Sequence, residues 1–337
     1  MQQVELMHRA LSLSEKGLGL TCPNPIVGAV IVNASGEFIS EGFHQRVASP
    51  DHAEVVAIKS AHVPLTGATM YVTLEPCNHI GATPPCTAAI IDAGISRVVV
   101  AHKDPHALAS GGIKKLSDAG IDVEVGLLSK EVAFSNRSWL HKIATGRPRI
   151  IWKIALSQDG KILEGEGSPS WVSSEESRAD VQILRSQSDA IVVGTGTALV
   201  DNPHLNPRLE SIVKNPDRIV IGMRDIPATF NLHDQSATTH FIKERDLEKV
   251  ISTISDHGYN QVLLECGPEL GNAFIQAGYL DELITYRSPH NLGTAGRDVF
   301  VGGVQLPEPS GFSIEKISES AIGVDTKSHY LLERKAG

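Results

Sequence analysis

Three side chains that favour zinc occur in order in the first third of the chain: His52, Cys77 and Cys86. Zinc prefers imidazole and thiolate ligands, and a catalytic zinc site uses three protein ligands while a fourth position stays open for water. This set therefore predicts one zinc ion per chain. The competing interpretation is that one histidine and two distant cysteines are simply buried residues without a metal.

Glu54 lies two residues after His52, where a carboxylate can carry protons beside a metal. An H-x-E motif followed by P-C is the signature of zinc-dependent base deaminases, which use metal-activated water to replace an amino group on a ring carbon. The usual cysteine spacing in that class is C-x-x-C, whereas eight residues separate Cys77 from Cys86 here. A structural zinc usually has four protein ligands and needs no carboxylate, so Glu54 favours a catalytic site over a metal-stabilised scaffold.

The elements that must position these residues alternate between strand and helix. Apolar runs bounded by turn formers predict strands, and amphipathic segments ended by glycine predict helices. A hairpin at the end of a parallel sheet would make that sheet mixed. The N-terminal helix is expected to place Val4, Met7 and Leu11 on one face. The other predicted elements are strands at 28–32, 37–41, 69–74, 97–101, 149–156, 190–193, 218–221, 261–265 and 282–286, helices at 52–61 and 86–93, and a hairpin at 312–332 around Gly323.

The composition is typical of a two-domain α/β protein. The chain has 337 residues, which at about 150 residues per domain suggests two domains. Aromatic residues make up only 5%, so the core depends on aliphatic side chains, as in the buried strands of α/β proteins. Turn formers at 144–148 predict a boundary there, between domains at 1–146 and 147–337.

Charge, hydropathy and cysteine content argue against several other classes of protein. A net charge of −9 argues against a nucleic-acid binder, including a tRNA or DNA base deaminase. No apolar run approaches the roughly 20 residues needed to span a bilayer, and the chain starts as an amphipathic helix rather than a signal peptide, so we expect a cytoplasmic protein. Four cysteines are too few for a disulfide framework. The mixed-sign run at 243–246 is typical of a solvated helix start rather than a binding patch.

The chain resembles the bifunctional deaminase–reductases of riboflavin biosynthesis, the RibD/RibG family. The resemblance implies an α/β fold, with a cytidine-deaminase-like zinc domain at 1–146 and a dihydrofolate-reductase-like domain at 147–337. The matching segments follow the family's order over nearly the full chain. They include PNPIVGAVIV, DHAEVVAI, YVTLEPCNHIGATPPC and AGISRVVVAHKDP in the first half, and WKIALSQDGKI, GTGTALVDNPHLNPR and LLECGPELGNAFIQAG in the second.

This resemblance implies two consecutive reactions. The first is hydrolytic deamination of 2,5-diamino-6-ribosylamino-4(3H)-pyrimidinone 5′-phosphate, and the second is NADPH-dependent reduction of the ribosyl side chain of 5-amino-6-(5-phosphoribosylamino)uracil to ribityl. It implies Zn²⁺ and NADPH as cofactors, small pyrimidine ribosyl phosphates as partners, and a homo-oligomer, either a dimer or a tetramer. An alternative keeps the reductase but gives the zinc domain an altered substrate or no activity.

The resemblance also implies roles for individual residues. Arg185 and Arg208 suit a phosphate because guanidinium can hold it bidentately, and backbone N–H groups at the helix start 267–271 suit a pyrophosphate. In the first domain the matches are the zinc ligands His52, Cys77 and Cys86, the proton shuttle Glu54, and the deaminase substrate residues Asn24, His44, His79 and Asp104. In the second they are the reductase substrate residues Lys153, Arg185, Leu205, Arg208 and Glu265, and the cofactor residues Ala155, Trp171, Thr197, Asp201, Gly267, Pro268 and Gly271.

Three positions depart from the family's usual pattern. Ala82 stands where a Lys or Arg is usual, His106 where an Asn is usual, and Pro169 where a Ser is frequent. A missing lysine at a phosphate removes a charge-assisted contact of about 1.5–3 kcal/mol. Because the zinc ligands and Glu54 are intact, we expect any change to affect substrate recognition, above all in the first domain.

Overall fold

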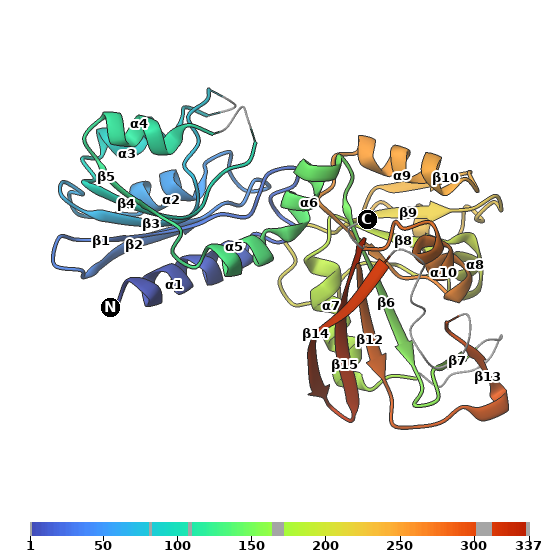
Figure 1. The fold of residues 1–337 in the computed structure, drawn as a ribbon. Helices are drawn as coiled ribbons and strands as arrows, with labels where there is room; N and C mark the ends of the chain where they lie inside the picture. The colour runs from blue at the N-terminus through green and yellow to red at the C-terminus, as the bar shows by residue number, and fades with distance from the viewer. Residues whose placement is uncertain (1, 81–82, 107–109, 164–171, 301–311, 335–337) are drawn as a thin grey trace. The chain divides into compact units, whose positions relative to one another are not determined.

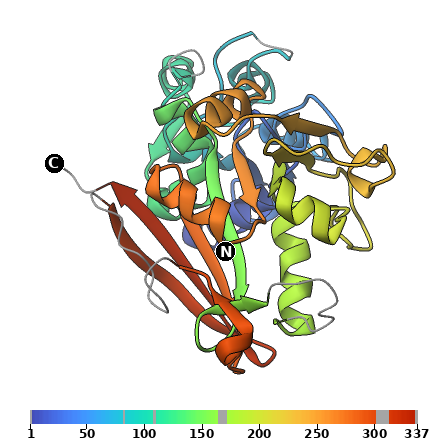
Figure 2. The same cartoon turned by 90° about the vertical axis from the view of Figure 1, so that its right-hand side faces the viewer.

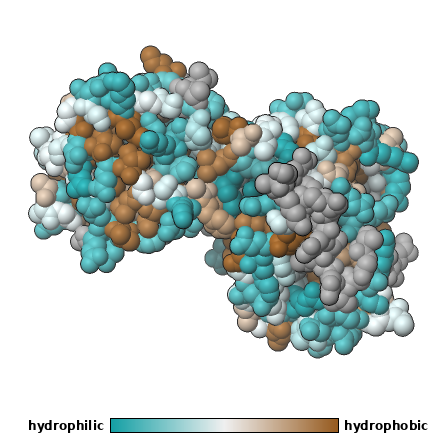
Figure 3. All heavy atoms as spheres, viewed as in Figure 1, coloured by the Kyte–Doolittle hydropathy of each residue, from teal (hydrophilic) through white to brown (hydrophobic). Residues whose placement is uncertain are grey.

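Each half of the chain builds its own β-sheet, and the halves form separate units at Met1–Gly146 and Arg147–Gly337 (Figure 1). This computed structural model describes residues 2–80, 83–106, 110–163, 172–300 and 312–334. Hydrophilic and hydrophobic side chains are intermixed on the face seen in Figure 3. Among the described residues, none of the helices is both long and apolar enough to cross a membrane.

The first unit has a five-stranded sheet in the order β2-β1-β3-β4-β5. β1 is antiparallel to β2 and β3, whereas β3, β4 and β5 are parallel, so the sheet is mixed. The strands are β1 (Gly28–Val32), β2 (Phe38–Phe43), β3 (Thr69–Leu74), β4 (Arg97–His102) and β5 (Asp122–Val125). The helices are α1 (Gln3–Glu15), α2 (Ala53–Lys59), α3 (Cys86–Asp92), α4 (Gly112–Asp118), α5 (Ser129–Ser135) and α6 (Arg137–Thr145).

Helices cover both faces of this sheet, because apolar side chains point to both faces along its strands. Val30 and Val99 pack with α1 and α5, whereas Ile31 and Val100 pack with α2, α3 and α4. Side chains alternate between the two faces of a strand, so a fully apolar run such as β1 needs a helical layer on each side. This two-sided burial fixes where the starts of α2 and α3 lie.

The predicted face of the N-terminal helix is only partly buried in the structure. Val4 is 42% exposed, and the buried stripe runs through Leu6, Ala10 and Leu13 together with Met7. These residues recur at the helical spacing i, i+4, i+7, which places them above one another against the sheet. Val4 lies beside that stripe, on the solvent side of the first turn.

The second unit has an eight-stranded sheet in the order β10-β9-β8-β11-β6-β12-β15-β14. In this order, the first six strands, from β10 at the edge to β12, are parallel to one another. The terminal hairpin is formed by β14 and β15, and β15 pairs antiparallel with β12. The mixed sheet and the hairpin were both predicted, whereas β10 was not. The strands are β6 (Arg149–Leu156), β8 (Ala190–Gly194), β9 (Asp217–Ile221), β10 (Thr239–Ile242), β11 (Gln261–Leu264), β12 (Glu282–Arg287), β14 (Phe312–Ile322) and β15 (Asp325–Arg334), and a separate pair is formed by β7 (Lys161–Leu163) and β13 (Gly296–Asp298).

Helices also cover both faces of this second sheet (Figure 2). Ile151, Ile191 and Leu263 form one core with Val181 of α7 and Ala198 of α8. On the other face the indole of Trp152 packs against α10. The helical elements are α7 (Glu175–Ser186), α8 (Thr195–Asp201), α9 (Leu247–Asp256), α10 (Pro268–Gln276), and the short 3₁₀ turns η1 (Asn231–His233) and η2 (Gly293–Ala295).

Candidate active sites

The predicted zinc ligands converge in the first unit. Ligand atoms of His52, Cys77 and Cys86 all lie within 4.8 Å of one another. His52 Nδ1 is 3.5 Å from Cys77 Sγ and 3.3 Å from Cys86 Sγ. One nitrogen and two sulfurs at this spacing fit a single zinc ion, which binds such ligands at about 2.0–2.3 Å.

Secondary structure explains why these three residues meet. His52 is the N-cap of α2, Cys86 is the first residue of α3, and Cys77 follows the end of β3. The Cys86 N–H donates to Cys77 Sγ at 3.4 Å. Hydrogen bonding to Cys86 lowers the pKa of the Cys77 thiol, against the effect of its burial, so Cys77 ionises before Cys86.

Glu54 lies beside the ligands on the first turn of α2, with 3% of its surface exposed. Burial raises its pKa to about 7, although nearby His52 opposes the shift. A carboxyl group titrating near neutral pH can both accept and release a proton, which is the requirement for a proton shuttle. The structure thus brings Glu54 to the site its sequence position predicts.

His44 lies next to the predicted zinc ligand His52 and contacts Asn24. The carbonyl oxygen of Asp51 is 2.9 Å from His44 Nδ1, so Nδ1 carries the proton and donates. Burial lowers the pKa of His44, which leaves its ring neutral and its Nε2 able to accept from Asn24 Nδ2 at 3.1 Å. The His44 ring packs edge-on against His52, with 5.1 Å between ring centroids. These contacts hold the Asn24 carboxamide in one orientation beside the metal site.

The other two predicted deaminase substrate residues lie on connecting segments. Asp104 follows β4 and is buried; its Oδ1 accepts from the His106 N–H at 2.7 Å, and burial raises its pKa. His79 is exposed, two residues after Cys77. Ala82 lies outside the described residues.

Glu75 is a buried residue that the sequence analysis did not single out. Its Oε1 accepts from the N–H groups of Gly111 at 2.9 Å and Ile113 at 3.1 Å, and its Oε2 accepts from the Asp104 N–H at 3.2 Å. The adjacent backbone is close-packed, since a Cβ at Gly112 would lie 1.8 Å from the Pro76 carbonyl oxygen. Glu75 therefore connects the segment that carries Asp104 to the end of β3, just before Cys77. An acidic residue directly after an apolar strand was the available signal.

Replacing Glu75 with glutamine should loosen this segment while leaving zinc bound. An amide NH₂ cannot accept the N–H groups that one carboxylate oxygen now accepts, and a buried unpaired donor costs about 1–3 kcal/mol. We expect a lower free energy of unfolding and a higher deaminase KM, with zinc content unchanged. Denaturant titration, ammonia release and elemental analysis measure these quantities, and exposed Glu37→Gln is the control. Parent-like stability and KM would contradict the role given to Glu75.

In the second unit, three predicted substrate residues form one charged cluster. Arg185 holds Glu265 bidentately, with Nε–Oε1 at 2.6 Å and Nη2–Oε2 at 2.9 Å, and Lys153 Nζ lies 3.6 Å from Glu265 Oε2. Burial would raise the pKa of Glu265, but Lys153 and Arg185 outweigh it and hold the pKa at about 2. Two positive charges thus face one negative charge, which leaves the cluster suited to an anionic ligand.

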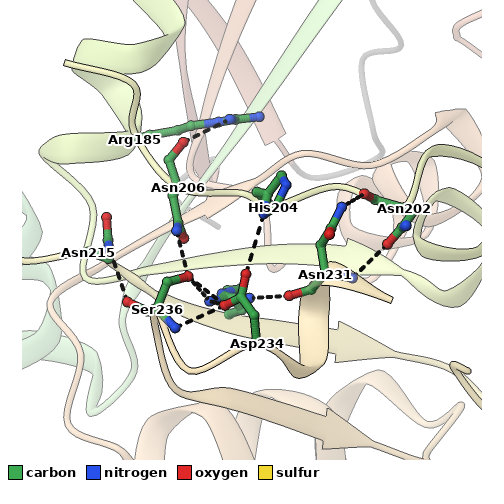
Figure 4. Close-up of polar contacts among 9 residues, drawn as sticks. Arg185, Asn202, His204, Asn206, Asn215, Asn231, Asp234 and Ser236 are labelled. Atoms are coloured by element: carbon green, nitrogen blue, oxygen red, sulfur yellow. Dashed lines mark hydrogen bonds and ion pairs between the residues drawn. The ribbon is translucent and has the colours of Figure 1, made fainter. Parts of the chain in front are cut away.

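The segment that carries Leu205 and Arg208 is held by polar contacts on both sides (Figure 4). Arg185 Nη1 donates to the Asn206 carbonyl oxygen at 3.3 Å, and Asn206 Nδ2 donates to Ser236 Oγ at 2.7 Å. Leu205 is 2% exposed and has a positive φ of 59°. The Arg208 side chain is exposed, while its N–H donates to Gln182 Oε1 at 3.1 Å.

A buried arginine, Arg218, anchors the neighbouring turn to this segment. Its guanidinium donates to Asp234 Oδ1 and Ser236 Oγ, each at 2.6 Å. Asn202 Oδ1 accepts from the Asn231 N–H at 2.8 Å. Together with the Asn206–Ser236 bond, these contacts orient the loop after α8 and the turn η1 as one assembly (Figure 4).

The predicted cofactor residues lie on three elements. Thr197 and Asp201 are on α8, Ala155 is on β6, and Gly267 and Pro268 begin α10. Trp171 lies outside the described residues, as does Pro169.

Gly271, another predicted cofactor residue, lies on α10 directly against the Trp152 indole. A Cβ at Gly271 would lie 2.2 Å from the Trp152 indole. That packing alone requires a glycine, so its presence is explained without a bound cofactor.

Comparisons with known proteins support the predicted family for both halves of the chain. The cytidine and deoxycytidylate deaminase zinc-binding region matches residues 1–102, and the RibD C-terminal domain matches residues 148–327. A riboflavin biosynthesis protein RibD of Mycobacterium tuberculosis is 42% identical over 307 residues, which is 89% of this chain and 90% of that protein.

Two solved structures are similar over nearly their whole length. RibD of Acinetobacter baumannii has a TM-score of 0.87 at 33% identity and covers 98% of this chain and 99% of its own. A diaminohydroxyphosphoribosylaminopyrimidine deaminase/5-amino-6-(5-phosphoribosylamino)uracil reductase of Thermotoga maritima has a TM-score of 0.87 at 31% identity, over 97% and 98% of the two chains. These similarities confirm the resemblance seen in the sequence and the predicted fold class. By sequence over most of its length and by the fold of both its units, the chain belongs to the RibD family of riboflavin biosynthesis proteins.

Proposed function

We propose that the unit Met1–Gly146 deaminates the diaminopyrimidinone ribosylamine 5′-phosphate and that the unit Arg147–Gly337 reduces the resulting uracil's ribosyl side chain to ribityl. The chain is a bifunctional enzyme of riboflavin biosynthesis with Zn²⁺ and NADPH as its cofactors. The observation that supports this division most strongly is the convergence of His52, Cys77 and Cys86 beside buried Glu54.

In the deaminase reaction, His52, Cys77 and Cys86 hold the zinc. Zinc, when bound, supplies a Lewis acid that makes water a nucleophile near neutral pH. Glu54 accepts a proton from the attacking water and delivers it to the pyrimidine ring as the C–O bond forms. It then accepts the proton left on the added hydroxyl and delivers it to the amino group, which departs as ammonia when the C–N bond breaks. Asn24, held by neutral His44, contacts the edge of the base.

In the reductase reaction, the charged cluster binds the phosphate-bearing substrate. NADPH, when bound, supplies the hydride. Arg185 and Lys153 attract the anionic substrate, while Glu265 keeps both cations oriented and limits their excess charge. Arg208 is exposed and available for a phosphate, which guanidinium binds bidentately. The cofactor-binding surface of this proposal consists of Ala155, Thr197, Asp201 and the start of α10.

A coupled assay tests the whole proposal. Purified full chain is given the diaminopyrimidinone phosphate and NADPH, and ammonia and NADPH oxidation are followed together. We expect ammonia release, followed by NADPH oxidation that depends on it. NADPH oxidation with the deaminated substrate but no ammonia release would favour the alternative of a deaminase domain with altered or lost activity. Absence of both ammonia release and NADPH oxidation would refute the proposal.

We also propose that the chain works as a cytoplasmic homo-oligomer, a dimer or a tetramer. The family resemblance supports this proposal. Light scattering on the purified protein distinguishes these states from a 36.1 kDa monomer. A monomer at enzyme assay concentrations would contradict it.

Glu265→Gln is expected to impair only the reductase. Hydrogen bonds to charged groups contribute about 1.5–3 kcal/mol, so loss of the bidentate Arg185 contact should lower reductase kcat/KM roughly tenfold to hundredfold. Ammonia release should be unchanged. Exposed Glu248→Gln, on α9, is the matched control. Equal loss of both activities would contradict the role of Glu265, and so would no loss of either activity.

The same substitution should have a pH-dependent effect on stability. The pKa of Glu265 falls from 4.5 to about 2 in the folded protein, so its ionised form stabilises the fold above pH 4.5. That contribution is lost as the pH drops from 4.5 toward 2. The stability difference between parent and Glu265→Gln should therefore be larger at pH 7 than at pH 3, as denaturant titration would show.

A further inference from the structure

Asn136 is a buried polar residue of the first unit that none of the roles above uses, with 4% of its surface exposed. It lies between α5 and α6. Its backbone N–H donates to the Val132 carbonyl oxygen at 2.9 Å, and its carbonyl oxygen accepts from the Leu140 N–H at 3.0 Å. Because both helices hold its backbone, the Asn136 carboxamide extends from a fixed position.

The Asn136 carboxamide makes two hydrogen bonds to a single residue, Ile26. Its Nδ2 donates to the Ile26 carbonyl oxygen at 2.7 Å, and its Oδ1 accepts from the Ile26 N–H at 3.0 Å. Ile26 is also buried and lies 110 residues earlier in the chain. A carboxamide offers the same donor and acceptor as a peptide group, so Asn136 takes the place of a neighbouring strand.

Ile26 needs such a partner because the pairing of β1 with β3 ends before it. The last residue pair of these two strands is Ala29 with Val72. Beyond that pair, the Gly28 N–H donates to the Thr73 side chain, with Oγ1 at 3.1 Å. Alternate residues of a strand direct their N–H groups to the same side, so Ile26 faces the same side as Gly28. Two side chains, those of Thr73 and Asn136, therefore complete the hydrogen bonding on this side.

The segment held in this way carries Asn24, the proposed contact to the base. The Asn24 N–H donates to the Thr21 carbonyl oxygen at 2.9 Å, and Thr21 Oγ1 donates to the Asn24 carbonyl oxygen at 3.1 Å. On the β2 side, the His44 N–H donates to the Val27 carbonyl oxygen at 3.0 Å, and the His44 ring contacts the Asn24 side chain. His44 thus holds the segment from one side and Asn136 from the other.

We propose that Asn136 is a positioning residue of the deaminase, which holds the Ile26 backbone so that the Asn24 carboxamide meets the edge of the pyrimidine ring. This inference rests on the proposed deaminase function. Asn136 acts through the backbone, since both ends of its carboxamide are bonded to Ile26. A purely structural role predicts different kinetics, because it would change stability without changing the contact between Asn24 and the substrate.

Substrate kinetics of the full chain separate these two roles. Asn136→Asp keeps an oxygen for the Ile26 N–H but has no N–H for the Ile26 carbonyl oxygen. We expect the KM for the diaminopyrimidinone phosphate to rise about twofold to tenfold, the contribution of one hydrogen bond, with kcat and zinc content unchanged. Thr73→Val is the matched control, because it removes the buried acceptor of the Gly28 N–H and leaves the Asn136 contacts in place. It should lower stability without raising KM.

A double variant tests whether the effect passes through Asn24. Asn24→Ala removes the proposed base contact and should raise KM by at least as much as Asn136→Asp. Residues that act as one unit have non-additive effects, so adding Asn136→Asp to Asn24→Ala should leave KM at the value of Asn24→Ala alone. Additive increases in KM would overturn the proposal. A parent-like KM for Asn136→Asp would also overturn it, as would an equal rise in KM for Thr73→Val.

Hydrogen–deuterium exchange examines the same segment without turnover. Asn136→Asp should speed exchange of the backbone N–H groups in residues 21–27, while β4 stays protected as in the parent. Asn136→Ser, smaller and uncharged, is measured beside it, so that misfolding of the charged variant leaves the comparison intact. Parent-like protection of residues 21–27 in the folded variant would overturn the proposal. Absence of ammonia release by the parent would refute the deaminase function, whereas exchange would still decide whether Asn136 holds this segment.

Discussion

Glu54→Gln is expected to abolish ammonia release while leaving zinc bound and the fold intact. Glutamine is nearly isosteric with glutamate, so the buried first turn of α2 can keep its packing. A carboxamide cannot carry a proton between water, ring and leaving group, and general acid–base catalysis contributes about 10²–10⁴-fold. We expect a loss of that size in deaminase kcat, measured as ammonia release at saturating substrate.

The reductase is the internal control for this substitution. With deaminated substrate and NADPH, Glu54→Gln should oxidise NADPH at the parent rate, because the residues proposed for the reductase reaction lie in the other unit. Zinc content should stay at about one per chain. If Glu54→Gln releases ammonia as fast as the parent, the shuttle is another group and the role given to Glu54 is wrong.

Removing both thiolate ligands should remove the zinc together with the deaminase activity. In a Cys77→Ala, Cys86→Ala double variant only His52 remains of the three converging ligands. A single imidazole should lose its zinc during desalting, because protein zinc sites use at least three protein ligands. We expect elemental analysis of a zinc-reconstituted, desalted sample to fall from about one zinc per chain to near zero.

Cys266→Ala is the matched control, because it removes a buried thiol of the second unit that takes no part in the ligand group. It should retain zinc and ammonia release. The double variant should in turn retain NADPH oxidation with the deaminated substrate. Unchanged zinc content in the double variant would refute the ligand assignment, and loss of reductase activity would show that the zinc supports both units.

Local patterns in the sequence were sufficient for the metal site and for most strands. His52 and Glu54 are two residues apart at a helix start, so their relation does not depend on distant parts of the chain. Strands such as β3 and β6 were predicted with the bounds they have, because each is a buried apolar run between turns. These features arise from short-range periodicity and ligand chemistry, which a sequence displays directly.

Outside the metal site, tertiary structure alone determined which charged residues from distant parts of the chain contact one another. Glu75 binds N–H groups up to 38 residues away, and Arg185 meets Glu265 across 80 residues. Each of these contacts follows from strand order, which sets the neighbours of a strand end but leaves no periodic trace in the sequence. A single charged residue has the same sequence appearance at the solvent surface as in a site, so only the sheet topology separates the two.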